Sequence, residues 1–158
     1  MKILRYEENG TIHYGIIDGF GDISQLAGSP FDSLDTNGVS TKLDQVRVLA
    51  PIAQPRIFGV GLNYAAHAAE GGKEPPPQPM LFMLPWTAVI SPGDDIVYPK
   101  QGKNIHFEGE LAVIIGKETK DVSKEKALDH VFGYTCGNDV SERGIQSAEI
   151  AQGCMLIG

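Results

Sequence analysis

The sequence lacks the features that would place it in a membrane or in an oxidising compartment. Two cysteines in 158 residues, Cys136 and Cys154, do not make a disulfide framework. No apolar run approaches the roughly 20 residues that a transmembrane helix requires. The first residues also lack the apolar core of a signal peptide. We therefore expect a cytoplasmic protein without a membrane partner.

Positive charge is also scarce. The 13 Lys and Arg residues are outnumbered by 20 Asp and Glu residues, so the formal net charge is -7. Phosphate contacts need clustered Lys and Arg, and no basic stripe occurs in the chain, so we expect no nucleic-acid partner. The apolar fraction of 42% and the charged fraction of 21% are typical of a soluble globular protein.

The first third of the chain shows a pattern of short strands and turns. Residues 1–6 and 11–17 have strand character, and Asn9-Gly10 between them is a strong hairpin signal. Residues 21–44 are rich in Ser, Asp, Gly and Thr, so we expect loops there with one short helical turn.

Ala50-Pro51 interrupts the pattern and indicates a boundary. A chain of this length can hold one domain with a proper core, or a small domain plus part of a larger one. The sequence therefore predicts a strand-rich α+β fold. Residues 1–50 would form a small N-terminal β domain, and residues 51–158 would form the first part of a larger mixed-sheet core.

Two carboxylates stand directly before the most apolar stretch of the chain. Residues 111–115 form a β-branched run that predicts a buried strand closed by Gly116. If the strand extends back through Glu108 and Glu110, both side chains lie on one face, about 7 Å apart along the chain. Two such anions repel unless water or a cation separates them, and a hard divalent cation satisfies both. On the pattern alone, a solvated strand end explains the pair as well.

A glycine pair precedes a predicted helix. Residues 57–60 predict a strand, and Gly59 and Gly61 lead from it to a helix over 64–70, which is half of a dinucleotide-binding fingerprint. Tyr64 stands where the third glycine belongs, and a proline-rich run follows the helix in place of a βαβ unit. A nicotinamide-dependent oxidoreductase is therefore a disfavoured alternative. We expect the glycines to let backbone pass close by.

Within that helix, His67 and Glu70 are three residues apart and share a face. A carboxylate beside an imidazole fixes its tautomer and favours its charged form, which suits a histidine that takes a proton from water. An ordinary surface pair is the alternative on spacing alone.

A further strand over residues 131–137 leads to Asp139. Ser141 then stands where it can cap a helix that carries Arg143 and Gln146.

Three blocks of sequence, residues 56–70, 107–116 and 133–143, occur in an order and at a spacing that resemble the fumarylacetoacetate hydrolase family. The resemblance runs from residue 51 to the last residue. It implies a barrel-like core that is incomplete in this chain. Family members continue beyond the apolar run at 155–157, where a new strand is expected, so the chain is expected to be a fragment.

The resemblance implies a metal site and a catalytic pair. The metal, Mg²⁺ or else Mn²⁺ or Ca²⁺, would be held by the carboxylates of Glu108, Glu110 and Asp139. His67 and Glu70 would be the catalytic pair.

The resemblance also implies substrate-binding residues, Tyr64, Arg143 and Gln146. Glu142 and Gly144 depart from the family pattern, which has a small residue and an acid at these two positions. The substrate would be a small 2-oxo acid, and the protein would be a homodimer.

The activity that the resemblance implies is that of a divalent-metal-dependent hydrolase or lyase. It would act on carbon-carbon bonds of 2-oxo or diketo acids through a metal-stabilised enolate, as fumarylacetoacetase or acylpyruvase does. The same enolate serves a decarboxylase, isomerase or hydratase of the same family, so these are alternatives. A non-catalytic metal-binding or ligand-binding module is an alternative of another class.

Overall fold

The computed structural model describes residues 1–153, so the strand expected at 155–157 lies outside the described residues. The chain forms two compact units. The first unit contains residues 1–51 and 105–141, and the second contains residues 52–104 and the chain from 142 onward. Strands predominate over helices, which confirms the α+β class. Within residues 1–153 the strands form four separate sheets, and none closes into a barrel.

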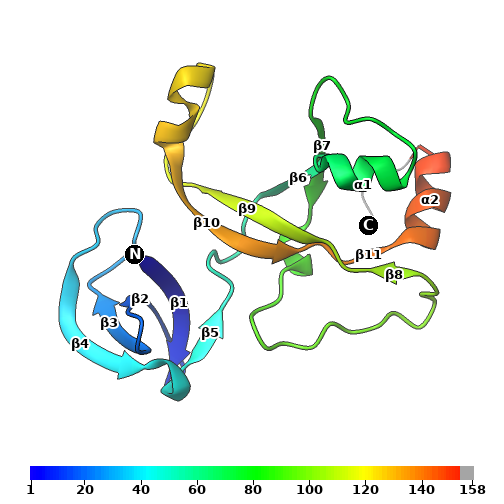
Figure 1. Cartoon of the computed structure of the whole chain (residues 1–158). Coiled ribbons are helices and arrows are strands. Elements are labelled where there is room, and N and C mark those ends of the chain that lie inside the picture. The colour runs from blue at the N-terminus through cyan, green and yellow to red at the C-terminus, as the bar shows by residue number, and fades with distance from the viewer. Residues whose placement is uncertain (154–158) are drawn as a thin grey trace. The chain divides into compact units, whose positions relative to one another are not determined.

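The first unit opens with a five-stranded antiparallel sheet in the order β4-β3-β2-β1-β5. Its strands are β1 Lys2–Glu8, β2 Thr11–Ile17, β3 Asp22–Leu26, β4 Thr36–Lys42 and β5 Arg47–Leu49, with a 3-10 turn η1 at Leu43–Gln45. Asn9 and Gly10 both have positive φ, 50° and 76°, as a tight hairpin turn requires. The predicted first hairpin is therefore confirmed, and β4 curves around the outside of the sheet (Figure 1).

The core of this sheet is built from side chains of three strands. Tyr6 and Ile23 are fully buried, Leu26 is 3% exposed and Leu49 is 8% exposed. A side chain at Gly15 would meet Ile23 Cγ2 at 2.5 Å from its Cβ, so the glycine allows the close approach of β2 and β3.

The expectation of loops over residues 21–44 is wrong at β3 and β4, which form there, whereas residues 27–35 are irregular and a short helical turn forms as η1. Ile23 and Leu26 of β3 are both buried although they are three residues apart, and the pairing of β3 with β4 is irregular between Ser24 and Leu26. Strict alternation is thereby lost, and the polar composition hides the strands.

The rest of the first unit is a long hairpin (Figure 1). Its strands, β9 Gly109–Ile115 and β10 Val131–Asn138, pair antiparallel, and the 3-10 helix η3 Lys124–His130 lies between them in the chain. The two-residue strands β8 Ile105–His106 and β11 Ser141–Glu142 also pair. Both predicted long strands are confirmed. The burial expected for residues 111–115 is wrong: Leu111, Val113 and Ile115 are exposed, and Ala112 and Ile114 are half-buried.

The second unit contains the antiparallel pair β6 Ile57–Gly61 and β7 Met80–Leu84, the helices α1 Ala65–Glu70 and α2 Arg143–Ala151, and the 3-10 turn η2 Trp86–Ala88. A dinucleotide-binding unit requires parallel strands joined by the helix, so the antiparallel pairing of β6 with β7 argues against the nicotinamide alternative. None of the helices in residues 1–153 is both long and apolar enough to cross a membrane.

The glycine pair on β6 has a packing role. A Cβ at Gly59 would overlap the ring of Phe82, and a Cβ at Gly61 would lie 2.5 Å from Met80 Cε. Phe82 stands opposite Gly59 and Met80 stands opposite Gly61 in the β6–β7 register. The expectation that these glycines let neighbouring chain pass close by is therefore confirmed.

Candidate functional site

The β9–β10 ladder extends one residue pair beyond its last strand residues, and this extension places two carboxyl-bearing residues opposite each other. The backbone N–H of Asp139 donates to the carbonyl oxygen of Glu108, with N and O 2.9 Å apart. The N–H of Glu108 donates to Oδ1 of Asn138 at 3.0 Å. Glu110 stands opposite Gly137 in the same register.

This register gathers the three predicted ligands at one end of the hairpin. Directly opposite residues point to the same face of a sheet, and so do residues two apart on one strand. The register therefore places three half-buried residues on one face of the ladder: Glu108, Glu110 and Asp139.

The chemistry of this donor set fits a hard divalent cation, because Mg²⁺, Mn²⁺ and Ca²⁺ prefer carboxylate oxygen. Within residues 1–153, however, no three His, Cys, Asp or Glu side chains lie close enough together to hold a metal ion. The backbone thus brings the three residues to one end of the ladder, while their side-chain oxygens do not converge on a point. Glu108, Glu110 and Asp139 stay predicted ligands.

The predicted catalytic pair lies on α1. Nδ1 of His67 and Oε2 of Glu70 are 3.6 Å apart, and the side chains are 38% and 77% exposed. This distance allows an ion pair when His67 is protonated but exceeds a good hydrogen bond. Ala68, the fully buried residue of α1, anchors the helix, while Tyr64 precedes it in extended backbone and is 43% exposed.

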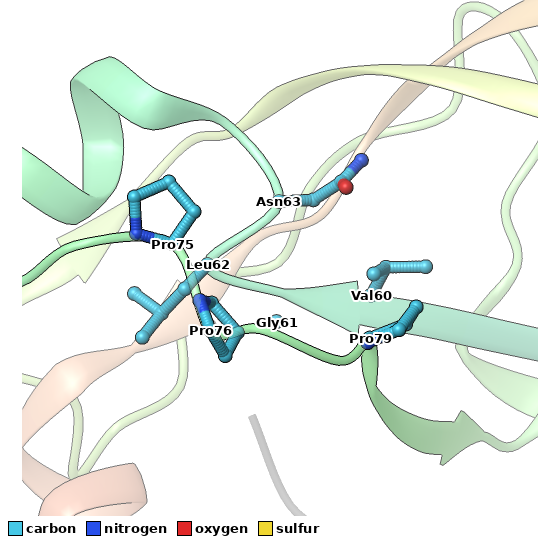
Figure 2. Close-up of a pocket in the computed structure, with 7 residues that line it drawn as sticks. All are labelled: Val60, Gly61, Leu62, Asn63, Pro75, Pro76 and Pro79. Atoms are coloured by element: carbon cyan, nitrogen blue, oxygen red, sulfur yellow. The ribbon is translucent and has the colours of Figure 1, made fainter.

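A small pocket of about 110 Å³ lies where β6 ends and α1 begins. It is lined by residues 60–63 and three prolines of the following loop: Val60, Gly61, Leu62, Asn63, Pro75, Pro76 and Pro79. In Figure 2, Leu62 lies with Pro75 and Pro76, Val60 lies with Pro79, and the amide of Asn63 points away from the proline rings. This pocket was not predicted from the sequence, although the proline-rich run that follows α1 lines part of it.

Leu62 adopts a φ of 54° at this pocket. A positive φ is uncommon for a branched residue, and such strain clusters at functional positions. Nothing in the residue type of Leu62 signals this conformation, so sequence reasoning missed it.

Two of the predicted substrate-binding residues, Arg143 and Gln146, contact each other on α2. Nη1 of Arg143 donates to Oε1 of Gln146 at 2.8 Å, and both side chains are half-buried. Because the amide oxygen of Gln146 accepts this bond, the pair presents N–H groups. Such donors suit an anionic carboxylate.

The residue that caps α2 is Glu142, so the prediction that Ser141 caps it is wrong. Ser141 is buried in β11, while the Glu142 side chain accepts a hydrogen bond from the N–H of Ile145. The backbone N–H groups of Ile145, Lys103 and Asn104, in that order of effect, hold the pKa of the Glu142 carboxyl below its usual range. Glutamate is not among the preferred capping residues, which is why the sequence pattern favoured the serine.

The sequence and the fold now identify the family. Residues 56–155 match the fumarylacetoacetate (FAA) hydrolase C-terminal family, and residues 1–51 match the Rv2993c-like N-terminal family. The chain belongs to the fumarylacetoacetate hydrolase family. Members of this family among the solved structures share its strand-rich fold.

Three similar proteins illustrate the relationship, and two of them carry a named activity. Protein Rv2993c of Mycobacterium tuberculosis is 41% identical over 94% of this chain and 58% of its own length. The structure of 5-carboxymethyl-2-hydroxymuconate delta-isomerase from Mycobacterium smegmatis is 36% identical, with a TM-score of 0.86 over 99% of this chain and 60% of that one. Maleylpyruvate hydrolase from Sphingobium sp. SYK-6, solved with manganese(II) and pyruvate, is 28% identical, with a TM-score of 0.70 over 91% and 60%. The chain thus spans less than two thirds of the length of these relatives.

Proposed function

We propose that the protein is a divalent-metal-dependent hydrolase or lyase that cleaves carbon-carbon bonds of 2-oxo or diketo acids. The observation that carries this proposal is the hydrogen bond from the Asp139 N–H to the Glu108 carbonyl, since it pins two carboxyl-bearing residues opposite each other, with Glu110 two residues further on. These three residues would hold Mg²⁺, Mn²⁺ or Ca²⁺. When bound, such a cation supplies a Lewis acid that polarises a carbonyl oxygen.

The imidazole of His67 would take a proton from the attacking water. Glu70 Oε2 lies 3.6 Å from Nδ1 of His67, so Nδ1 would carry the hydrogen as the two side chains approach, and Nε2 would accept the proton. Once the imidazole is charged, the nearby carboxylate stabilises it. The 3.6 Å separation fits this role, because catalytic hydrogen bonds are often long before substrate binds.

Arg143 and Gln146 would bind the carboxylate of the 2-oxo acid through their N–H groups. Tyr64, exposed at the start of α1, would contact the substrate from the element that carries His67. These three side chains lie in the second unit, as the catalytic pair does.

A 2-oxo acid isomerase is the second candidate. The delta-isomerase from Mycobacterium smegmatis favours it, whereas the maleylpyruvate hydrolase with bound manganese(II) and pyruvate favours carbon-carbon cleavage and a metal. Cleavage of an acylpyruvate releases pyruvate, while isomerisation moves a double bond and releases nothing. A coupled pyruvate assay beside ultraviolet absorbance therefore separates the two. The homodimer and the cytoplasmic location stay predictions, and light scattering checks the first.

The metal site is tested in the whole protein by titrating Mg²⁺ or Mn²⁺ during thermal unfolding. A ligand that binds the native state alone raises the melting temperature with its occupancy. Glu110→Gln should weaken this response, while Glu118→Gln, an exposed carboxylate beyond β9, should leave it intact. An identical response in Glu110→Gln and wild type would show that the ligand set is wrong.

The catalytic pair is tested by His67→Ala and Glu70→Gln. His67→Ala should lower kcat by about a hundredfold to ten-thousandfold, the range supplied by a positioned general base. Metal affinity by calorimetry should stay nearly unchanged, and Glu70→Gln should have the smaller effect on kcat because its side chain still hydrogen-bonds. An unchanged kcat in His67→Ala would make the two residues an ordinary surface pair.

A further inference from the structure

The carboxylate of Glu142 joins two segments of the second unit. Its Oε1 accepts hydrogen bonds from the backbone N–H groups of Lys103 and Asn104, at 3.0 and 2.8 Å. Its Oε2 accepts from the N–H of Ile145 in the first turn of α2. Because the acceptor is charged, each of these bonds is stronger than a neutral one. One side chain thus holds the start of α2 against a segment about forty residues earlier.

A second contact also links the start of α2 to Asn104. The backbone N–H of Arg143 donates to the carbonyl oxygen of Asn104 at 2.9 Å. Asn104 therefore donates to the residue before Arg143 and accepts from Arg143 itself. The backbone of Arg143 is held on both sides, which fixes where its side chain starts.

Gly144 leaves room for this arrangement. A Cβ at this position would lie 3.2 Å from Oε2 of Glu142 and 3.5 Å from Oε1. The first distance is tighter than an ordinary van der Waals contact, so a larger side chain at 144 would push the carboxylate aside. The position of the Glu142 carboxylate is therefore set from the helix as well as from residues 103 and 104.

We propose that Glu142 is a positioning residue for substrate binding. By fixing the first turn of α2, it sets where Arg143 and Gln146 present their N–H groups to the substrate carboxylate. Glu142 itself does not touch the substrate. The proposal deepens the proposed function and rests on it, because it assumes that this pair binds the carboxylate of a 2-oxo acid.

The test is steady-state kinetics on an acylpyruvate, with the whole metal-loaded protein and pyruvate as a calorimetric probe. Glu142→Ala should raise KM and weaken pyruvate binding by about tenfold, as expected when charge-assisted hydrogen bonds around a binding residue are lost. The kcat should change less than threefold, because the metal site and His67 lie on other elements. Glu142→Gln keeps one acceptor oxygen and should restore most of the affinity.

A double-mutant cycle shows whether Glu142 acts through Arg143. Glu142→Ala added to Arg143→Ala should change KM much less than Glu142→Ala does alone, because the guanidinium is gone and only Gln146 is left to position. Glu125→Ala is the matched control, since this carboxylate also accepts a backbone hydrogen bond near a helix start but lies in η3. It should leave KM unchanged.

Each outcome decides the proposal. An unchanged KM in Glu142→Ala, or a full tenfold effect that persists in the Arg143→Ala background, would overturn it, and so would a loss of thermal stability with no change in KM. If Glu142→Ala does not fold, Gly144→Ala gives the same reading, because its Cβ would displace the Glu142 carboxylate from the start of α2 and should raise KM. A wild-type protein that neither turns over 2-oxo acids nor binds pyruvate would instead overturn the proposed function, and the role of Glu142 with it.

Discussion

The N-terminal sheet and the β9–β10 hairpin are both antiparallel and belong to the same unit, yet the sheet buries large apolar side chains and the hairpin exposes them. In the sheet, Tyr6 and Ile23 are fully buried. In the hairpin, Leu111, Val113 and Ile115 are 61%, 48% and 54% exposed. The same strand periodicity therefore yields a closed core in one case and an uncovered apolar face in the other.

The exposed face of the hairpin is continuous across both strands. Tyr134 stands opposite Val113 and is 58% exposed, and Cys136 stands opposite Leu111 and is exposed too. Contiguous exposed apolar surface of this kind is typical of interaction sites for proteins, membranes or ligands and of surfaces that promote aggregation. The carboxylates of the proposed metal site lie on the opposite, half-buried face, because Glu110 and Leu111 are adjacent on one strand.

The largest effect that separates the two regions is expected at Ile23. Ile23→Ala removes a fully buried side chain and should cost about 2–5 kcal/mol of unfolding free energy, the range for such truncations. Urea denaturation measures the change. Ile12→Ala is the matched control in the same sheet, since Ile12 is 51% exposed, and it should cost far less. Equal costs would contradict the assignment of the core to the inner face.

A smaller, pH-dependent effect is expected at Asp18 in the turn after β2. The backbone N–H groups of Phe20 and Asp22 donate to its Oδ1 at 2.8 and 3.0 Å and hold the pKa of Asp18 below its usual value of 3.8. A lowered pKa means that the charged carboxylate stabilises the fold above pH 3.8 and that this contribution is lost as the pH falls through the lowered value. Wild type should be more stable than Asp18→Asn at pH 7, and the gap should close on acidification. A gap that widens in acid would reverse the assigned sign.

The smallest effect is expected on the exposed face of the hairpin. Leu111→Ser in the 158-residue chain should change the unfolding free energy by less than about 0.5 kcal/mol, as surface substitutions usually do. The same substitution should reduce self-association, because it breaks the apolar surface. Light scattering and urea denaturation measure the two quantities. A cost as large as that of Ile23→Ala would mean that this face is covered in solution.

Much of the local structure could be predicted from residue type and spacing. The Asn9-Gly10 turn, the strand before Gly116 and the helix around His67 follow from contacts between neighbours in the chain, and all three form. The two strands between residues 21 and 44 could not be predicted in this way. Ile23 and Leu26 are both buried although they are three residues apart, so alternation of residue type does not reveal β3, and polar residues surround them.

The order and spacing of three motifs were enough to predict the family, because they are properties of the sequence and do not depend on which residues meet in the folded protein. Tertiary structure alone decided which residues meet. The register of β9 with β10 sets Asp139 opposite Glu108, and the backbone N–H groups of residues 103 and 104 donate to the carboxylate of Glu142. These contacts join residues about thirty to forty positions apart. Local propensity carries no information about such pairs, since their geometry depends on how whole strands and helices pack.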